Sequence, residues 1–277
     1  ISLTQEIRDA LDIEDAQQSC TPDQLITAIL KAPAQLLWNG GIGTYVKAST
    51  ETNVDVGDKN NDAIRINGTD LRAQVVGEGG NLGFTQLGRV EAARRGVRIN
   101  TDAIDNSAGV DTSDHEVNVK ILFAPLIASG EMSIEQRNSL LHEMTDSVAS
   151  HVLRDNFDQN VVLSNARAGA IRLLNVHQRM SKELERLGLL NRALEFLPDD
   201  EEFATRKAAG VGLTSPELAV LLAYAKIQVL QELNATDLGL NPWCDHIVGN
   251  YFPERLSPEF DAQIFSHPLR GPIANTV

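Results

Sequence analysis

Small and amide side chains gather in three loops that each follow a predicted strand. The first loop begins at Asn39-Gly40, the second runs from Gly77 to Asn81, and the third is centred on Asn106. Glycine lets a ligand approach the backbone closely, and asparagine offers both a hydrogen-bond donor and an acceptor. We therefore expect the three loops to form one composite ligand-binding rim.

The elements that must position these loops follow the pattern of parallel α/β units. Short apolar strands are predicted at 34–38, 73–76 and 97–100, and Ser113 is predicted to cap a helix over 114–128. Alternation of strand, loop and helix is typical of a parallel sheet, and ligands bind at the carboxyl ends of its strands. The predicted fold class is α/β, with a partial doubly wound parallel (Rossmann-like) sheet followed by an all-α region.

Strand signals stop near the middle of the chain, and the rest of the sequence is predicted to be helical. The run from Leu218 to Leu230 is apolar on nearly all sides, which predicts a core helix. We expect residues 1–130 to form the second half of a dinucleotide-binding domain. Residues 131–277 are expected to form a C-terminal helical domain.

The glycines of the second loop allow two interpretations. Gly77, Gly79 and Gly83 are spaced like a pyrophosphate-binding loop, but Leu82 interrupts the standard G-x-G-x-x-G pattern. The loop is therefore either a cofactor loop or a plain tight turn. The two other asparagine-bearing loops favour a ligand site.

Composition and missing motifs exclude several classes of protein. The chain of 277 residues has a formal net charge of −14, whereas nucleic-acid phosphates require a basic surface. The sequence contains no P-loop, serine nucleophile elbow, H-E-x-x-H or C-x-x-C motif, so hydrolase and metalloenzyme interpretations lack support. It has no apolar run of membrane-spanning length and no signal peptide. We expect a cytoplasmic protein with no nucleic-acid or membrane partner.

No metal site is expected from the spacing of acidic residues. Asp58, Asn60 and Asp62 alternate like the start of a calcium loop, but Thr69 stands where that loop needs its bidentate glutamate. A solvated loop over residues 47–70 is the favoured interpretation, and a cation site is the alternative.

Several motifs together resemble the large NAD-specific glutamate dehydrogenases of bacteria. The motifs are Glu78-Gly79-Gly80-Asn81, Asn106-Ser107-Ala108-Gly109-Val110 and Ser113-x-x-Glu116. Glutamate dehydrogenases carry E-G-A-N, N-A-G-G-V and S-Y-x-E in that order. Longer segments at 36–47 and 213–219 are similar as well. Gly80 and Ala108 depart from the family pattern, and these departures concern the pose of the nicotinamide ring.

The resemblance implies NAD-dependent oxidative deamination of L-glutamate to 2-oxoglutarate and ammonia, in a homo-oligomeric enzyme. It implies that Ser113 contacts the side-chain carboxylate of glutamate, and that two of the asparagines lie beside the nicotinamide and its ribose. The residues expected to bind NAD are Asn39, Gly40, Gly79, Gly80, Asn81 and Asn106.

The resemblance also shows what this sequence lacks. The family's catalytic lysine and aspartate, and its first βαβ unit, have no counterpart here, so the catalytic residues are unknown. We therefore expect the chain to be a C-terminal fragment of a longer enzyme, inactive alone because acid–base groups must lie within hydrogen-bond reach of the substrate. The alternative is a non-catalytic α/β–helical module that binds a regulatory ligand or a partner subunit.

Overall fold

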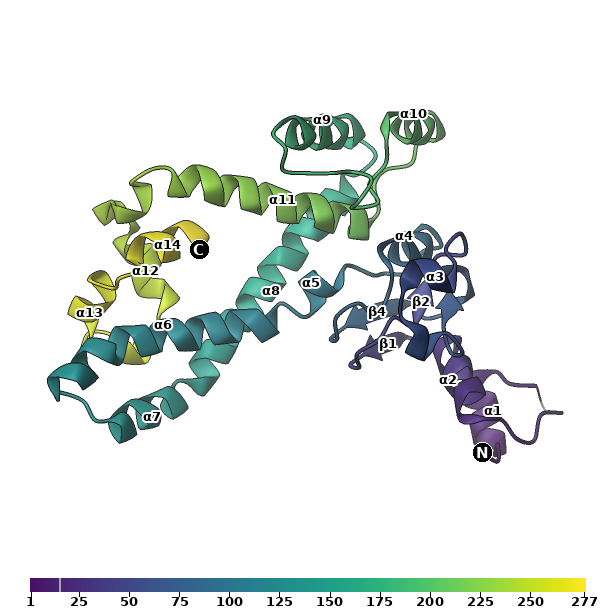
Figure 1. The fold of residues 1–277 in the computed structure, drawn as a ribbon, viewed down its shortest axis with the longest axis horizontal. Helices are drawn as coiled ribbons and strands as arrows, with labels where there is room; N and C mark the ends of the chain where they lie inside the picture. Colours follow the sequence, from purple (N-terminus) through teal and green to yellow (C-terminus); the bar gives the residue numbers. More distant parts are fainter. Residues whose placement is uncertain (15) are drawn as a thin grey trace. The chain divides into compact units, whose positions relative to one another are not determined.

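The computed structural model describes residues 1–14 and 16–277, which form two compact units (Figure 1). Unit 1 contains Ile1–Asn106 and Asn160–Tyr224, and unit 2 contains Ser107–Gln159 and Ala225–Val277. All strands that the structure describes lie in unit 1, and unit 2 is helical. The expected division of the chain into two domains at residue 130 stays a prediction.

The main sheet of unit 1 is a parallel pair. β1 (Leu36–Asn39) pairs with β4 (Val75–Glu78), and the register places Asn39 opposite Glu78 at the carboxyl ends of both strands. The predicted parallel pairing of these two segments is confirmed. A second parallel pair joins β2 (Val46–Lys47) to β3 (Ile66–Asn67).

The third expected strand, at 97–100, is present as an isolated β-bridge to β4. This segment joins β4 through a parallel bridge between Val75 and Arg98, and the N–H of Val76 donates to the carbonyl of Arg98 over 2.9 Å. The α/β class is therefore confirmed in a mostly helical chain. The doubly wound arrangement stays a prediction.

The segment at 47–70 is mostly exposed or half-buried, as expected for a solvated loop, but it contains short regular elements that were not expected. It contains α3 (Asn53–Val56) and the short 3-10 helices η1 (Lys59–Asn61) and η2 (Gly68–Asp70), in addition to β3. The buried guanidinium of Arg65 organises it, because Nε donates to the carbonyl of Thr44 over 2.8 Å and Nη1 pairs with Asp62 at 2.5 Å. Arg65 thus pairs with the Asp62 carboxylate, which the calcium-loop interpretation assigned to a metal cation.

Helices make up the rest of the chain. The remaining helices of unit 1 are α1 (Gln5–Leu11), α2 (Pro22–Leu30), α4 (Gln86–Arg94), α5 (Asp102–Asp105), α9 (Leu174–Arg186) and α10 (Asp200–Ala209). Those of unit 2 are α6 (Ala108–Ser129), α7 (Ile134–Glu143), η3 (Leu238–Leu240), η4 (Pro242–Cys244), α12 (Asp245–Tyr251), η5 (Glu254–Leu256), α13 (Asp261–Phe265) and α14 (Arg270–Thr276). Helices α8 (Thr145–Ala168) and α11 (Ser215–Asn234) contribute residues to both units.

Helix α6 begins earlier than predicted, which changes the role of Ser113. The helix starts at Ala108, with Asp111 in its first turn, where an acidic side chain is favoured by the helix dipole. Ser113 therefore lies inside the helix and not at its cap, and its Oγ donates to the carbonyl of Val110 over 2.7 Å. The expected C-terminal end is confirmed, because Gly130 caps the helix in the left-handed conformation.

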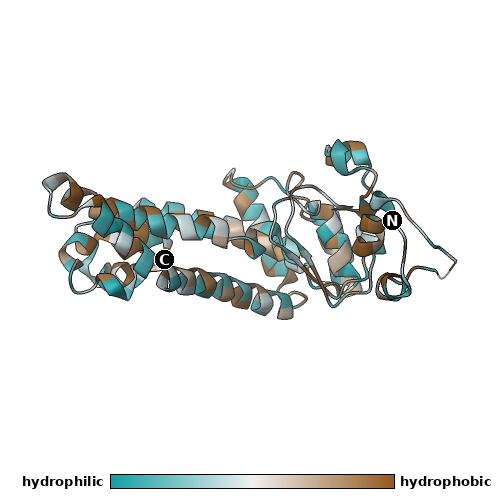
Figure 2. Cartoon of the chain, turned by 90° about the horizontal axis from the view of Figure 1, so that it is seen from below, coloured by the Kyte–Doolittle hydropathy of each residue, from teal (hydrophilic) through white to brown (hydrophobic). Residues whose placement is uncertain are grey.

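Each unit has its own hydrophobic core. In unit 1 one buried cluster includes Leu184 and Leu218 and another surrounds Phe84, whereas the core of unit 2 surrounds Phe123. Figure 2 shows hydrophobic and hydrophilic residues alternating along the helices, as expected when one face of each helix packs against a core. Among the described residues, no helix combines the length and apolar character needed to cross a membrane.

The predicted core helix at 218–230 is buried only in its first half. Leu218 and Leu221 are each 3% exposed, whereas Ile227 is 45% and Val229 is 54% exposed. The apolar sequence alone could not show where along α11 the packing ends.

Core packing predicts a contrast between two leucines of unit 1. Leu184 is 1% exposed and Leu194 is 73% exposed. Leu184→Ala should lower the free energy of unfolding by about 2–5 kcal/mol, because it removes buried methyl groups and leaves a cavity. Leu194→Ala should change it by less than about 0.5 kcal/mol. Denaturant titration of both variants checks this, and equal effects would contradict the assignment of the core.

Candidate functional site

The loops after β1 and β4 touch at the carboxyl end of the sheet. The N–H of Gly80 donates to the carbonyl of Asn39 over 2.9 Å. A Cβ placed on Gly80 would lie 2.5 Å from the carbonyl oxygen of Gly41, which is closer than real Cβ atoms approach. Position 80 therefore has no room for the alanine of the E-G-A-N pattern, which gives the departure from that pattern a physical cause.

The indole of Trp38 accounts for two of the glycines in the second loop. A Cβ on either Gly77 or Gly79 would come within 2.6 Å of the Trp38 ring. The ring is itself 60% exposed, so it forms part of the surface beside the loop. The glycine spacing that resembles a pyrophosphate loop thus has a packing cause at these two positions.

Asn39 extends its side chain over the third glycine of that pattern. A Cβ on Gly83 would lie 1.8 Å from Nδ2 of Asn39. The Oδ1 atom accepts a hydrogen bond from the N–H of Gly41 over 3.3 Å, whereas the buried Nδ2 has no hydrogen-bond partner among residues 1–14 and 16–277. Buried polar groups are nearly always hydrogen-bonded, so this donor is an exception at the first loop.

The second and third loops meet through a pair of asparagines. Nδ2 of Asn106 donates to Oδ1 of Asn81 over 2.5 Å. That bond leaves Nδ2 of Asn81 as a donor and Oδ1 of Asn106 as an acceptor. One donor and one acceptor are complementary to a primary carboxamide, which carries one carbonyl oxygen and one amino group.

A buried ion pair holds these loops in place. The carboxylate of Glu78, at the end of β4, accepts from Nε of Arg89 over 2.7 Å and from Nη2 over 3.0 Å. Glu78 is fully buried, and its Oε1 also accepts from the N–H of Phe84 over 3.1 Å. Arg89 lies on α4, so this pair fixes the strand that ends in the glycine loop against the helix that follows it.

Two aspartates extend this network to the third loop. Asp102 lies 3.2 Å from Nη2 of Arg89 and accepts from the N–H of Leu82 over 2.8 Å. Asp105 accepts from the N–H of Glu78 over 3.0 Å. Burial raises the pKa of Asp105 and of Glu78, because the charged form of each carboxyl loses solvation. The hydrogen bond and charge of Arg89 oppose the rise at Glu78.

The structure brings together most of the residues expected at the site. The expected cofactor residues, which are Asn39, Gly40, Gly79, Gly80, Asn81 and Asn106, all belong to unit 1 and to the three loops. Ser113 belongs to unit 2, where it is exposed on α6. The roles of all seven residues in binding stay predictions.

The sequence alone did not identify the residues that support the three loops, which are Glu78, Arg89 and Trp38. A charged residue at the end of an otherwise apolar strand was the available signal for Glu78. No local pattern identified its partner, because Arg89 is on the next helix and looks like an ordinary amphipathic position. For Trp38 the available signal was its position near the end of a predicted strand, directly before Asn39.

The buried pair predicts a pH-dependent loss of stability. Arg89→Met leaves the Glu78 carboxylate buried without its partner, which should cost about 3–5 kcal/mol near pH 8. In that variant the hydrogen bond and charge of Arg89 no longer oppose the burial that raises the pKa of Glu78, and among the described residues only the N–H of Phe84 still contacts the carboxylate. A raised pKa means that the folded state binds the proton more tightly than the unfolded state. The deficit relative to the unsubstituted protein should therefore shrink as the pH falls through the raised pKa.

Denaturant titration over a series of pH values measures that deficit. The double variant Glu78→Gln with Arg89→Met is the control, because it has no carboxyl at position 78, so its deficit should change less with pH than that of Arg89→Met. A deficit of Arg89→Met that stays constant with pH would contradict the account.

Comparison with known proteins agrees with the motifs of these loops. The family model for bacterial NAD-glutamate dehydrogenase, catalytic domain, matches residues 1–166, and the model for glutamate dehydrogenase, C-terminal, matches residues 210–277. The chain is 48% identical to NAD-specific glutamate dehydrogenases of Mycobacterium tuberculosis and of Pseudomonas aeruginosa, and 45% identical to that of Halomonas elongata. Each match covers 100% of this chain and 17% of the relative. The chain belongs to the family of bacterial NAD-glutamate dehydrogenases.

Proposed function

We propose that this chain is part of an NAD-dependent glutamate dehydrogenase, which converts L-glutamate, NAD⁺ and water into 2-oxoglutarate, ammonium and NADH. The curated relatives carry the name NAD-specific glutamate dehydrogenase, and the chain spans 17% of their length. The part of the work assigned to this chain is to bind the nicotinamide end of NAD and one end of glutamate. The acid–base residues belong to the rest of the enzyme.

The asparagine pair is the observation that carries the proposal. The nicotinamide carboxamide presents a carbonyl oxygen and an amino group side by side. Nδ2 of Asn81 would donate to that oxygen, and Oδ1 of Asn106 would accept from that amino group. The existing bond between the two side chains orients both amides before the cofactor arrives, which lowers the ordering cost of binding.

The other loops fit the rest of the cofactor. The partnerless Nδ2 of Asn39 is buried, so a change of rotamer would be needed for it to donate to a hydroxyl or phosphate oxygen of the cofactor. Gly40, Gly79 and Gly80 would let such atoms approach the backbone. Bound NAD⁺ supplies the acceptor for the hydride that leaves the α-carbon of glutamate. The residues of this chain orient the acceptor and exclude other poses.

An uncovered sheet face fits a protein with more layers. Leu36, Trp38 and Val75 are exposed large apolar side chains on β1 and β4. The outer edge of β1 has no strand partner among the described residues. Both features suit a sheet continued by further strands of a longer enzyme, as the first half of a dinucleotide-binding domain would do. In this proposal residues 1–130 complete that domain, residues 131–277 form a helical domain, and the enzyme is a cytoplasmic homo-oligomer.

The asparagine pair can be tested by cofactor affinity. Asn81→Ala and Asn106→Ala in the full-length enzyme should each weaken NAD binding about 2- to 10-fold, because a hydrogen bond between neutral groups contributes about 0.5–1.5 kcal/mol. Asn165→Ala is the matched control, since Asn165 is an exposed asparagine of unit 1 on α8. Isothermal titration with NAD gives the affinities. Unchanged affinity in both rim variants would remove the pair from the cofactor site.

Ser113 can be tested by substrate affinity. A hydrogen bond to a carboxylate contributes about 1.5–3 kcal/mol, and the serine must first give up its bond to Val110. Ser113→Ala should therefore raise the KM for glutamate about tenfold, with little change in the KM for NAD. Ser129→Ala is the control on the same helix, where Oγ of Ser129 lies 3.1 Å from the carbonyl of Leu126 and 2.7 Å from the carboxylate of Glu131. An unchanged KM for glutamate would exclude Ser113 from the substrate site.

A further inference from the structure

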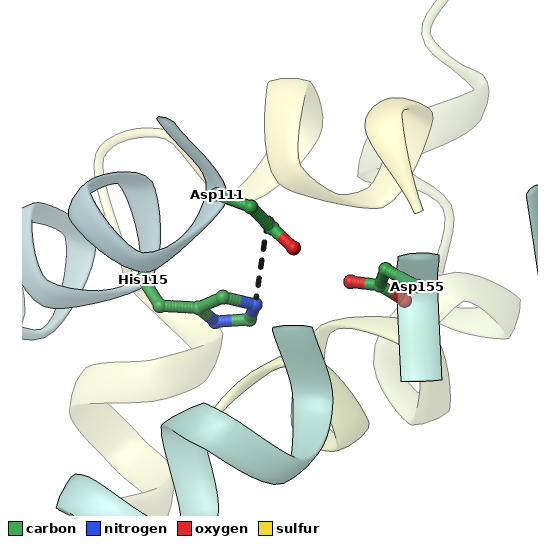
Figure 3. A group of neighbouring side chains, drawn as sticks. All are labelled: Asp111, His115 and Asp155. Atoms are coloured by element: carbon green, nitrogen blue, oxygen red, sulfur yellow. Dashed lines mark ion pairs between the residues drawn. The ribbon is translucent and has the colours of Figure 1, made fainter. Parts of the chain in front are cut away.

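Three metal-ligating side chains come together between α6 and α8 within unit 2. Asp111 and His115 are four residues apart on α6, so they share one face of that helix, and Asp155 faces them from α8 (Figure 3). One potential ligand atom from each of the three residues lies within 4.8 Å of the other two. Ser113 lies between the first two in sequence and therefore points to the opposite side of α6.

His115 is buried with its hydrogen-bonding capacity unused. It is 2% exposed, and neither ring nitrogen has a hydrogen-bond partner among residues 1–14 and 16–277. Nε2 lies 3.8 Å from Oδ1 of Asp111, which is an ion-pair distance and too long for a hydrogen bond. A neutral imidazole can satisfy one nitrogen by donating, but it needs an acceptor close by. Nε2 of the ring thus faces Asp111, and one ring nitrogen lies within 4.8 Å of a carboxyl oxygen of both Asp111 and Asp155.

The surroundings of the ring hold it in this orientation. The Tyr251 ring stacks on it with centroids 4.3 Å apart, and His151 contacts it edge-on at 5.5 Å. Burial lowers the pKa of His115, and burial raises the pKa of Asp111, with the neighbouring Asp155 charge adding to the rise.

We propose that Asp111, His115 and Asp155 bind a divalent transition-metal ion that ties α6 to α8. An imidazole beside two carboxylates favours Zn²⁺ or a similar first-row ion, whereas Mg²⁺ and Ca²⁺ prefer oxygen ligands throughout. Two negative charges compensate the ion. The exposed side of Asp155 leaves a coordination position for water and a path for the metal to enter.

The distances require a small closure around the ion. Tetrahedral coordination with bonds of about 2.0–2.1 Å places ligand atoms about 3.3 Å apart. The helical pair Asp111 and His115 is already close to that spacing. Asp155 is exposed, so a change of rotamer can bring its carboxylate in without moving the backbone.

The alternative is that these three residues form a metal-free cluster. In that case Asp111 and Asp155 would share a proton, and His115 would be a packed aromatic ring beside Tyr251. Zn²⁺ would then have no preferred site at these residues.

The test measures binding of Zn²⁺ itself to the full-length protein after removal of metals with a chelator. Isothermal titration and metal analysis after dialysis should show one class of Zn²⁺ site whose affinity falls at least about tenfold in Asp155→Asn and in His115→Asn, because even changes outside the ligand shell cost about 10- to 100-fold. Zn²⁺ should also raise the melting temperature of the unsubstituted protein and not that of Asp155→Asn.

Two matched variants make the comparison specific. His142→Asn and Asp158→Asn alter an exposed histidine and an exposed aspartate of unit 2 and should keep the Zn²⁺ affinity. Asp155 is exposed, so its substitution should leave the fold intact even if loss of the buried His115 does not. Equal Zn²⁺ affinity in the unsubstituted protein and in Asp155→Asn, with no difference in melting temperature, would overturn the proposal.

Discussion

The bidentate contact between Glu78 and Arg89 is the interaction on which the candidate site depends. It joins the end of β4 to helix α4. Asp102 contacts Arg89 and Asp105 accepts from the N–H of Glu78, which connects the pair to the loop that carries Asn106. A buried pair of this kind adds little net stability compared with apolar packing, but losing one partner is costly. Its contribution here is positional, because three loops from separate parts of the sequence are held at one end of the sheet.

Packing and binding are divided between different residues of these loops. The glycines at 77, 79 and 83 make room for the Trp38 ring and the Asn39 side chain, so their spacing records contacts within the protein. The amides of Asn81 and Asn106 are joined by one hydrogen bond, which leaves one donor group on Asn81 and one acceptor on Asn106 for a ligand. In the proposed function this division lets a broken glycine fingerprint belong to a cofactor rim. The asparagines would supply the specificity, and the glycines make room for Trp38 and Asn39.

The sequence could predict what depends on local pattern. The parallel pairing of 36–39 with 75–78 followed from two apolar runs that each end in a glycine loop. The start of α6 differs from the predicted cap at Ser113, because the residues before Ser113 resemble a loop in sequence although Asp111 suits the first turn of a helix. Contacts across elements had no local signal: Glu78 finds its partner on a helix, and Asp155 meets α6 from a helix 40 residues further along the chain.

The most direct test is an experimental structure of the full-length enzyme with NAD⁺ bound. The account predicts that the nicotinamide carboxamide lies between Asn81 and Asn106, with its oxygen about 2.7–3.2 Å from Nδ2 of Asn81 and its nitrogen at a similar distance from Oδ1 of Asn106. A carboxamide held by other residues, with the Asn81–Asn106 bond facing solvent, would contradict the assignment of this rim to the cofactor.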